Sequence, residues 1–553
     1  MSPTLGNDSE GAPAERVTSR IEKHSSGLRT IHVGVILLAG LLVRVPFYLA
    51  FWPIWSGDSP GYSLFYYLWR HHVFYLGART PVYPFFLGAA QWLAGDPLEP
   101  FLNQPAAYAA ILLQSALDIY AAVLFYLTLR SLRIRGSFAL GASLFLATIP
   151  SVCLLEVNIL NMSLGFFSLV GVMSLFIPTV QRLRTGKHLG FWAGLTGAAL
   201  AVAVLNRPEL LIFSVILLLI TACLPLRARQ TGSVSIFSAR SLGAAGWMTL
   251  PLASAVFAWM LLMYVGIGEF RITTSDGWNR TRTVYNLFDR VDAEDSAIGE
   301  IMARAYQQQV PRAASVNLRE IMWQVQDKLI LNYRRYPITD PTREPSRFHL
   351  RMDRFAHDVF GLVEIPCEVS PRYFCWQSMR RWINIGDYLG RVSWKLARRY
   401  PEDWIRNVAA NFFEESFTFR YSDAKPAVEG FEAHAAGGGP FVRNSSLAAL
   451  TTRAANAESP LLTVMYVVTL GYCVFFPVIF SREQDDHWLS DVSVAALAMA
   501  SVGTIVGTCV LAGLNRVYSL PHLVVFTTCT AYALENHARI VSVFRRARPA
   551  NPS

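Results

Sequence analysis

Apolar residues gather into long runs that polar segments separate, and this pattern dominates the chain. A helix of roughly 20 apolar residues crosses the hydrocarbon core of a bilayer, which is about 30 Å thick. The pattern therefore predicts an all-α polytopic membrane protein with about ten transmembrane helices. The predicted spans are 31–52, 106–129, 137–156, 159–180, 189–206, 209–226, 243–266, 461–481, 489–513 and 519–538.

Composition agrees with this class. Of the 553 residues, 53% are hydrophobic and only 16% are charged, whereas soluble domains carry about 25% charged residues. The 34 Phe, 22 Tyr and 14 Trp exclude a disordered or fibrous chain. Residues 1–30 are polar and lead into an apolar run that is too long for the core of a cleavable signal peptide, so no such peptide is predicted.

The net charge of +10 follows from topology rather than from nucleic-acid binding. Lys and Arg concentrate in the N-terminal tail, in alternate connections and in the C-terminal tail. The positive-inside rule then places both termini in the cytoplasm of a multi-pass plasma (inner) membrane protein. The residues concerned are Arg16, Arg20, Lys23, Arg29, Arg130, Arg133, Arg135, Arg182, Arg184, Lys187, Arg227, Arg229, Arg240, Arg545, Arg546 and Arg548.

This topology leaves two long segments outside. They are a first outer loop at 53–105 and a large outer loop at 267–460. The predicted organisation is a cytoplasmic tail at 1–30, a transmembrane core at 31–266, the extracytoplasmic loop domain at 267–460, three more spans within 461–540 and a second tail at 541–553.

The outer loops have helical patterns of their own. Residues 79–94 are apolar but too few to span, which predicts a helix lying at the membrane interface. In the large loop, apolar residues recur every four positions from Tyr388 to Phe412. Pro401 followed by two acidic residues marks a helix start inside this stripe. We therefore expect two helices, at 385–399 and 401–417.

Of the seven cysteines, two lie in the large outer loop and five in the apolar spans. Cys367 and Cys375 are the pair in the large outer loop, where an oxidising exterior favours a disulfide. Two free thiols are the alternative. The other five lie in apolar spans and are expected to be packing residues.

Ionisable residues at membrane depth are costly and point to function. Several such residues, contributed by different spans, lie at predicted outer ends, and their convergence on one face predicts a site there. The set is Asp58, Arg79, Glu156, Arg207, Glu209 and Arg516.

Each member has an alternative role. Asp58 lies in a Gly- and Pro-rich turn that holds a carboxylate in place, or that forms a simple Asx-turn. Arg79 suits bidentate binding of a phosphate, or of lipid headgroups. Glu156, in the turn between the third and fourth spans, is a site residue or a solvated turn residue. Arg207 runs against the charge bias of short outer loops and either holds a ligand anion or pairs locally with Glu209.

Two charged residues lie within spans. Asp118 is expected to make a buried polar contact between helices. Arg44, on the outer half of the first span, is expected to do the same or to support the site from below.

No metal or cofactor site is predicted. The chain has no phosphate loop, no H-E-x-x-H and no paired C-x-x-C. His71 and His72 are adjacent and cannot share a helix face. No Asp-x-Asp occurs near Asp58, so the sequence does not imply a divalent cation held by two acids there.

Several motifs together resemble a known family. They are Gly57-Asp58-Ser59-Pro60-Gly61-Tyr62, Arg79-Thr80-Pro81-Val82-Tyr83-Pro84, Leu113-Gln114, Asn206-Arg207-Pro208-Glu209 and Asn515-Arg516-Val517-Tyr518. In order and outward placement they resemble the GT-C polytopic glycosyltransferases. The resemblance is narrowest to a bacterial group related to protein O-mannosyltransferases and aminoarabinose transferases.

This resemblance implies a GT-C-like fold and a transferase that uses a polyprenyl-phosphate sugar on the extracytoplasmic face. Asp58 would act at the acceptor and Glu156 would be a second catalytic acid. Arg79 and Arg207 would bind the donor phosphate. The further substrate-binding candidates are Tyr62, Tyr83, Arg44 and Arg516.

Two departures from the pattern stand out. Ser59 follows Asp58, where many relatives have Asp-Glu, and Val517 separates Arg516 from Tyr518.

The chemistry fits these residue types. Inverting displacement at an anomeric carbon needs a base on the face opposite the leaving group. The leaving lipid phosphate is already anionic and needs cations rather than an acid. The implied partners are the lipid-linked donor, a glycan, lipid or protein acceptor, and membrane lipids, with no nucleic acid.

Three other functions stay open. A lipid-linked glycan ligase with a diphosphate donor would need additional outer cations. A lipid or sugar transporter or flippase would show paired halves and broken helices near the midplane. A non-catalytic scaffold or sensor would not need acids and arginines converging from separate turns.

Overall fold

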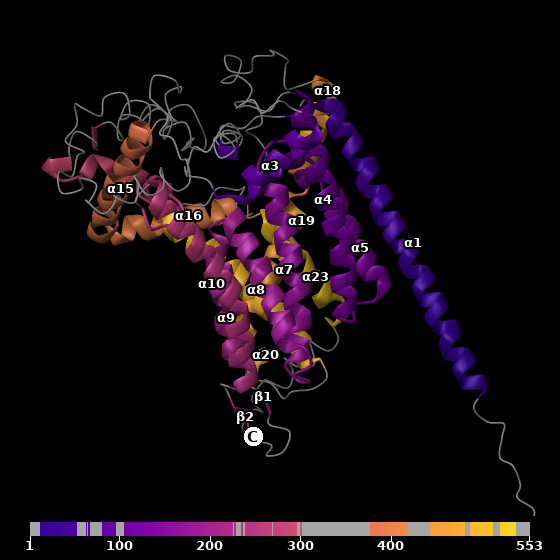
Figure 1. Cartoon of the computed structure of the whole chain (residues 1–553). Coiled ribbons are helices and arrows are strands. Elements are labelled where there is room, and N and C mark those ends of the chain that lie inside the picture. Colours follow the sequence, from indigo (N-terminus) through magenta and orange to yellow (C-terminus); the bar gives the residue numbers. More distant parts are fainter. Residues whose placement is uncertain are drawn as a thin grey trace, which may run out of the picture.

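The computed structural model describes residues 12–51, 53, 62, 65–66, 80–95, 104–224, 226–227, 234–235, 238–267, 269–295, 299–300, 376–417, 443–481, 487–512 and 520–537. Within these ranges the protein is helical apart from one short pair of strands, β1 (Leu226–Arg227) and β2 (Val234–Ser235). Figure 1 shows a bundle of helices with α15 (Trp376–Arg399) and α16 (Pro401–Phe417) at one end and β1 and β2 at the other.

Among the described residues, seven helices are long and apolar enough to cross a membrane, and an eighth span results if a bent pair is counted as one. The chain is therefore a nearly all-α polytopic membrane protein, as the apolar runs predict. The seven are Leu28–Ala50, Gln104–Ser131, Met162–Arg182, Leu189–Asn206, Ala239–Val265, Ser445–Val474 and Trp488–Leu511.

Each of the ten predicted spans coincides with a helix or a pair of helices. Those helices are α1 (Ala12–Ala50), α4 (Gln104–Ser131), α5 (Gly136–Thr148), α6 (Pro150–Glu156), α7 (Met162–Arg182), α8 (Leu189–Asn206), α9 (Leu210–Ala222), α10 (Ala239–Ile267), α19 (Ser459–Val474), α20 (Phe476–Ser481), α21 (Trp488–Ala512) and α23 (Leu523–Glu535). Because α9 and α23 are only 13 residues long, the count of ten stays a prediction.

Two predicted spans are not single helices. The third bends by 41° between α5 and α6, because Ile149 takes an extended backbone conformation before Pro150. The eighth begins much earlier than predicted, since α18 (Ser445–Ala457) precedes α19 within one apolar stretch. It ends in the separate helix α20, because the backbone leaves helical geometry at Phe475.

The core of the bundle contains apolar side chains from α1, α4, α5, α7, α8, α9, α10, α21 and α23, among them Phe125, Phe176, Leu200 and Trp488. Small residues let the helices approach: a Cβ on Gly197 would lie 2.1 Å from the carbonyl oxygen of Met248, so α8 and α10 are in backbone contact there. By contrast, α1 lies along the side of the bundle (Figure 1). It exposes a row of leucines, as expected for a lipid-facing helix.

The predicted helices of the outer loops are present. The helix α3 (Val82–Leu93) lies within the apolar segment 79–94, and α16 begins at Pro401 as predicted. The helix α15 starts nine residues before the predicted position 385, at Trp376. In Figure 1, α3, α16 and α18 gather at one end of the bundle.

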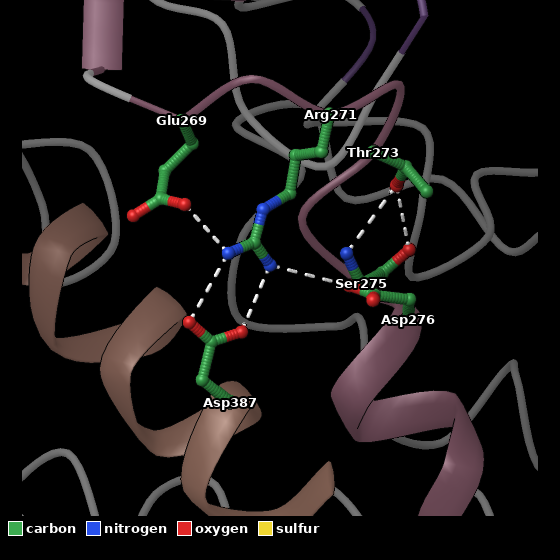
Figure 2. Close-up of polar contacts among 6 residues, drawn as sticks. All are labelled: Glu269, Arg271, Thr273, Ser275, Asp276 and Asp387. Carbon is green, nitrogen blue, oxygen red and sulfur yellow. Dashed lines mark hydrogen bonds and ion pairs between the residues drawn. The ribbon is translucent and has the colours of Figure 1, made fainter. Parts of the chain in front are cut away.

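A salt-bridge network fastens α15 to the segment that follows α10. Figure 2 shows the guanidinium of Arg271 between the carboxylates of Glu269 and Asp387. Two nitrogens of Arg271 bind Asp387, at 2.8 and 3.1 Å. The pKa of Arg271 is lowered by burial but raised more by its hydrogen bond to Asp387 and by the nearby charges, and the net shift is upward. The cation is therefore permanent at ordinary pH.

Candidate active site

A buried arginine joins three helices at the predicted outer end of the bundle. Arg44 on α1 donates from Nη1 to the carbonyl oxygens of Gly40 and Ala147, at 2.7 and 2.8 Å. Its Nε donates to Oε2 of Glu156 at 2.6 Å, and its Nη2 bonds to Oε1 of the same carboxylate. Ala147 lies in the last turn of α5 and Glu156 ends α6, so Arg44 connects both halves of the bent third span.

Glu156 is enclosed rather than solvated. Its side chain is 1% exposed and that of Arg44 is 2% exposed. Ser115 on α4 donates to Oε2 of Glu156 at 2.7 Å, and the hydroxyl of Tyr48 donates in turn to Ser115. This result removes the alternative of a solvated turn residue. The catalytic role of Glu156 stays a prediction, because both of its oxygens are engaged by the protein here.

The backbone at the end of α6 is held by Gln114, which Tyr83 of the first loop binds in turn. Gln114 on α4 donates from Nε2 to the carbonyl oxygens of Glu156 and Asn158, at 2.8 and 3.0 Å. Its own amide oxygen accepts a bond of 2.6 Å from the hydroxyl of Tyr83 on α3. The ring of Tyr62 packs edge-on against that of Tyr83, with centroids 4.8 Å apart. Two predicted substrate-binding tyrosines thus adjoin the turn that carries Glu156.

A second set of contacts joins the first outer loop to the turn between α8 and α9. The hydroxyl of Thr80 donates to the carbonyl oxygen of Asn206 at 3.2 Å. Asn161, which precedes α7, donates to the same oxygen at 3.0 Å. Thr80 follows Arg79 in the chain and Asn206 precedes Arg207. The bond therefore brings together the segments that carry the two predicted phosphate-binding arginines.

Arg207 is buried between α7 and the start of α9. Its Nε donates to Oε1 of Glu209 at 2.6 Å, and its Nη1 lies 2.8 Å from Sδ of Met162. A Cβ at position 165 would lie 2.7 Å from Cδ of Arg207, so Gly165 leaves the space that the Arg207 side chain occupies. The predicted local pairing with Glu209 is thus present, and the role in phosphate binding stays a prediction.

Some predicted site residues lie outside the described ranges. They are Asp58, Arg79, Arg516, Cys367 and Cys375. Their roles, including the disulfide, stay predictions.

The sequence analysis named Arg44 and Gln114 but did not single out Tyr48 and Ser115, the other polar residues of this cluster. Tyr48 lies one helical turn after Arg44, and Ser115 lies one turn before Asp118. Polar residues spaced by one turn inside apolar helices share a face. That spacing was the available signal for this cluster.

One acidic cluster could offer ligands to a metal ion. Within the described ranges, carboxylate oxygens of Asp292, Glu294 and Asp295 lie within 4.8 Å of one another. Lys395 donates to Glu294 at 2.5 Å and to Asp295 at 3.2 Å, and Arg399 bonds to Asp292. The hydrogen bonds to Glu294 and Asp295 raise the pKa of Lys395. Two cations thus already bind the three acids and offset most of their charge, so we assign the cluster a structural role.

Comparison with known proteins adds a similarity of fold. No protein-family model and no curated protein matches the chain. Among solved structures, the Archaeoglobus fulgidus oligosaccharyltransferase in the apo form is 12% identical with a TM-score of 0.44, over 95% of this chain and 52% of that one. ArnT from Cupriavidus metallidurans bound to undecaprenyl phosphate is 13% identical with a TM-score of 0.31, over 94% of this chain and 81% of that one.

A third solved structure is the S. cerevisiae protein O-mannosyltransferase Pmt1-Pmt2 complex bound to the sugar donor. It is 15% identical with a TM-score of 0.34, over 43% of this chain and 34% of that one. The chain spans about half the length of the archaeal oligosaccharyltransferase. All three TM-scores are below 0.5, so we rest the proposals below on the described residues. The chain is similar in structure to these three solved proteins.

Proposed function

We propose that this protein is a membrane glycosyltransferase of the GT-C kind. It transfers a sugar from a polyprenyl-phosphate donor to an acceptor on the extracytoplasmic face, with inversion at the anomeric carbon. Both termini lie in the cytoplasm, and the segment 267–460 forms an outer domain over the site. The acceptor is a glycan, a lipid or a protein.

The observation that carries the proposal is the bond from Thr80 to the carbonyl oxygen of Asn206. It supports a site at which Arg79 and Arg207, each one residue away, act on the same anion. Two guanidinium groups suit a lipid phosphate, because they neutralise the charge of the leaving group and bind phosphate oxygens in pairs.

The contacts of Tyr83 support the position of the proposed base. Tyr83 joins Tyr62 to Gln114 and thereby to the turn of Glu156. Tyr62 follows Asp58 by four residues, and in this proposal Asp58 acts beside the same turn. Asp58 would take the proton of the acceptor hydroxyl as that oxygen attacks the anomeric carbon. The bond from that carbon to the lipid phosphate oxygen breaks, and the electron pair leaves with the phosphate.

In this proposal Glu156 acts with Arg44. The ion pair fixes the bend of the third span, and with it the turn that the first outer loop contacts. Glu209 accepts a hydrogen bond from Nε of Arg207. This bond fixes the orientation of the guanidinium before a donor binds.

The test is sugar transfer by membranes that contain the wild type, Asp58→Asn or Asp289→Asn, from a panel of labelled polyprenyl-phosphate sugars. The first substitution keeps the shape of the side chain and removes the base. Asp289, a largely exposed acid in the predicted outer loop, provides the matched control. We expect transfer by the wild type and the control and at least a hundredfold less by Asp58→Asn. Equal transfer by all three would remove Asp58 from the catalytic role.

A further inference from the structure

A third ionisable residue, Asp118, lies beside the Arg44–Glu156 pair. Asp118 on α4 is 1% exposed. Neither of its carboxylate oxygens has a hydrogen-bond partner. An ionised carboxylate in that state is very unfavourable, since burial removes its hydration and nothing replaces it.

The charged neighbours of Asp118 set the net charge of this buried cluster. Glu156, Arg44 and Ser163 lie near it, from α6, α1 and α7. Among the described residues, Cys153 on α6, Tyr48 on α1 and, beyond Cys153, Glu458 are further titratable groups near this cluster. Two carboxylates thus face one guanidinium. If both acids were ionised, the enclosed cluster would carry a net negative charge, which is costly in a low-dielectric interior.

The two acids, Glu156 and Asp118, differ in their hydrogen bonds. Glu156 accepts from Nε and Nη2 of Arg44 and from the hydroxyl of Ser115, so its ionised form is stabilised. Asp118 has no partner at full hydrogen-bond geometry, and its only polar neighbours of this kind among the described residues are Ser163 and the carboxylate of Glu156 itself. The excess negative charge is therefore removed most easily at Asp118.

We propose that Asp118 is a neutral carboxylic acid in the folded protein and that the cluster of Arg44, Glu156 and Asp118 binds one proton. A proton neutralises the cluster without further ligands. A divalent ion would need at least six oxygen ligands and would reverse the charge of a site that already contains Arg44. The proposal concerns the resting protein and does not depend on transferase activity.

Thermal unfolding at several pH values tests it. Above the ordinary pKa of an aspartate, about 4, the unfolded chain releases the proton that the folded chain holds. Folding then takes up one proton, so the unfolding equilibrium constant rises about tenfold for each pH unit. Between pH 5.5 and 8 the wild type should lose stability with this slope relative to Asp118→Asn, which binds no proton.

The matched control is Asp491→Asn. Asp491 is also buried in a span, but it accepts a hydrogen bond of 2.7 Å from the hydroxyl of Tyr532. We expect this variant to keep the wild-type slope. A slope that persists in Asp118→Asn, or that disappears only in Asp491→Asn, overturns the proposal.

Infrared spectroscopy of the wild type provides a test that needs no variant. At pH 7, the carbonyl band of a protonated carboxylic acid should appear and should shift when aspartate is labelled with carbon-13. The absence of a labelled acid band overturns the proposal. Stabilisation of the wild type, but not of Asp118→Asn, when sodium replaces choline at constant ionic strength would also overturn it, by assigning the site to a metal cation.

Discussion

Arg44 and Glu156 form a bidentate ion pair across 112 positions of sequence, and both side chains are almost completely buried. The same guanidinium binds the carbonyl oxygen of Ala147 at the end of α5. The pair therefore stabilises the bend between α5 and α6, where the helical hydrogen bonds of the third span are interrupted. A charged pair placed at a helix break satisfies backbone groups that the lipid cannot.

Loss of either partner should destabilise the protein strongly. Arg44→Gln leaves Glu156 buried without its counter-charge, which costs about 3–5 kcal/mol. Thermal unfolding in detergent should show a clear fall in Tm for Arg44→Gln and for Glu156→Gln, and less than the sum of the two in the double variant. Arg135→Gln is the control, because Arg135 is 74% exposed. Additive losses would mean that the two residues act independently.

The contact between Thr80 and Asn206 should control donor binding. Thr80→Val removes the hydrogen bond to the carbonyl oxygen of Asn206 and keeps the shape of the side chain. If Arg79 and Arg207 bind the donor phosphate together, KM for the donor should rise about three- to tenfold for a lost bond of about 1 kcal/mol, with little change in kcat. Thr249→Val is the control, since Thr249 bonds only to its own helix. An unchanged KM for the donor in Thr80→Val would show that the contact between Thr80 and Asn206 does not affect donor binding.

The packing of α11 (Asp276–Arg280) on α15 should not tolerate a side chain at Gly277. A Cβ there would lie 1.9 Å from the carbonyl oxygen of Gly386, so Gly277→Ala must push the two helices apart. We expect a loss of about 1–3 kcal/mol, seen as faster proteolysis within the outer loop. Gly243→Ala is the matched control, because nothing lies within 4 Å of a Cβ at that position. Equal proteolysis of both variants would contradict the close packing.

Strong alkali should loosen the outer loop through Tyr388. Burial, and then the hydrogen bond to Asp295, raise the pKa of this tyrosine. A raised pKa in the folded state gives stability that is complete below the unfolded value, about 10, and that is lost as the pH rises through the folded value. Between pH 9 and 11, proteolysis should accelerate more in the wild type than in Tyr388→Phe. Equal acceleration of proteolysis in the wild type and in Tyr388→Phe would mean that ionisation of groups other than Tyr388 causes it.

The positions of the helices could be predicted from the sequence, because apolar runs and the start signal at Pro401 are local features. The bend at Pro150 was not predicted, since an apolar run does not reveal a backbone break within it. The partner of Arg44 could not be predicted either. Arg44 and Glu156 were each noted, but their pairing depends on how α1 and α6 pack, which no local pattern records.

Direct measurement of the reaction tests the central claim. Purified protein in vesicles would receive a polyprenyl-phosphate sugar labelled in both the sugar and the lipid, together with an acceptor extract. We predict sugar label in the acceptor, one molecule of polyprenyl phosphate released for each sugar transferred, and loss of both products in Asp58→Asn but not in Asp289→Asn. Intact donor that moves across the bilayer without cleavage would contradict the account and would identify a flippase.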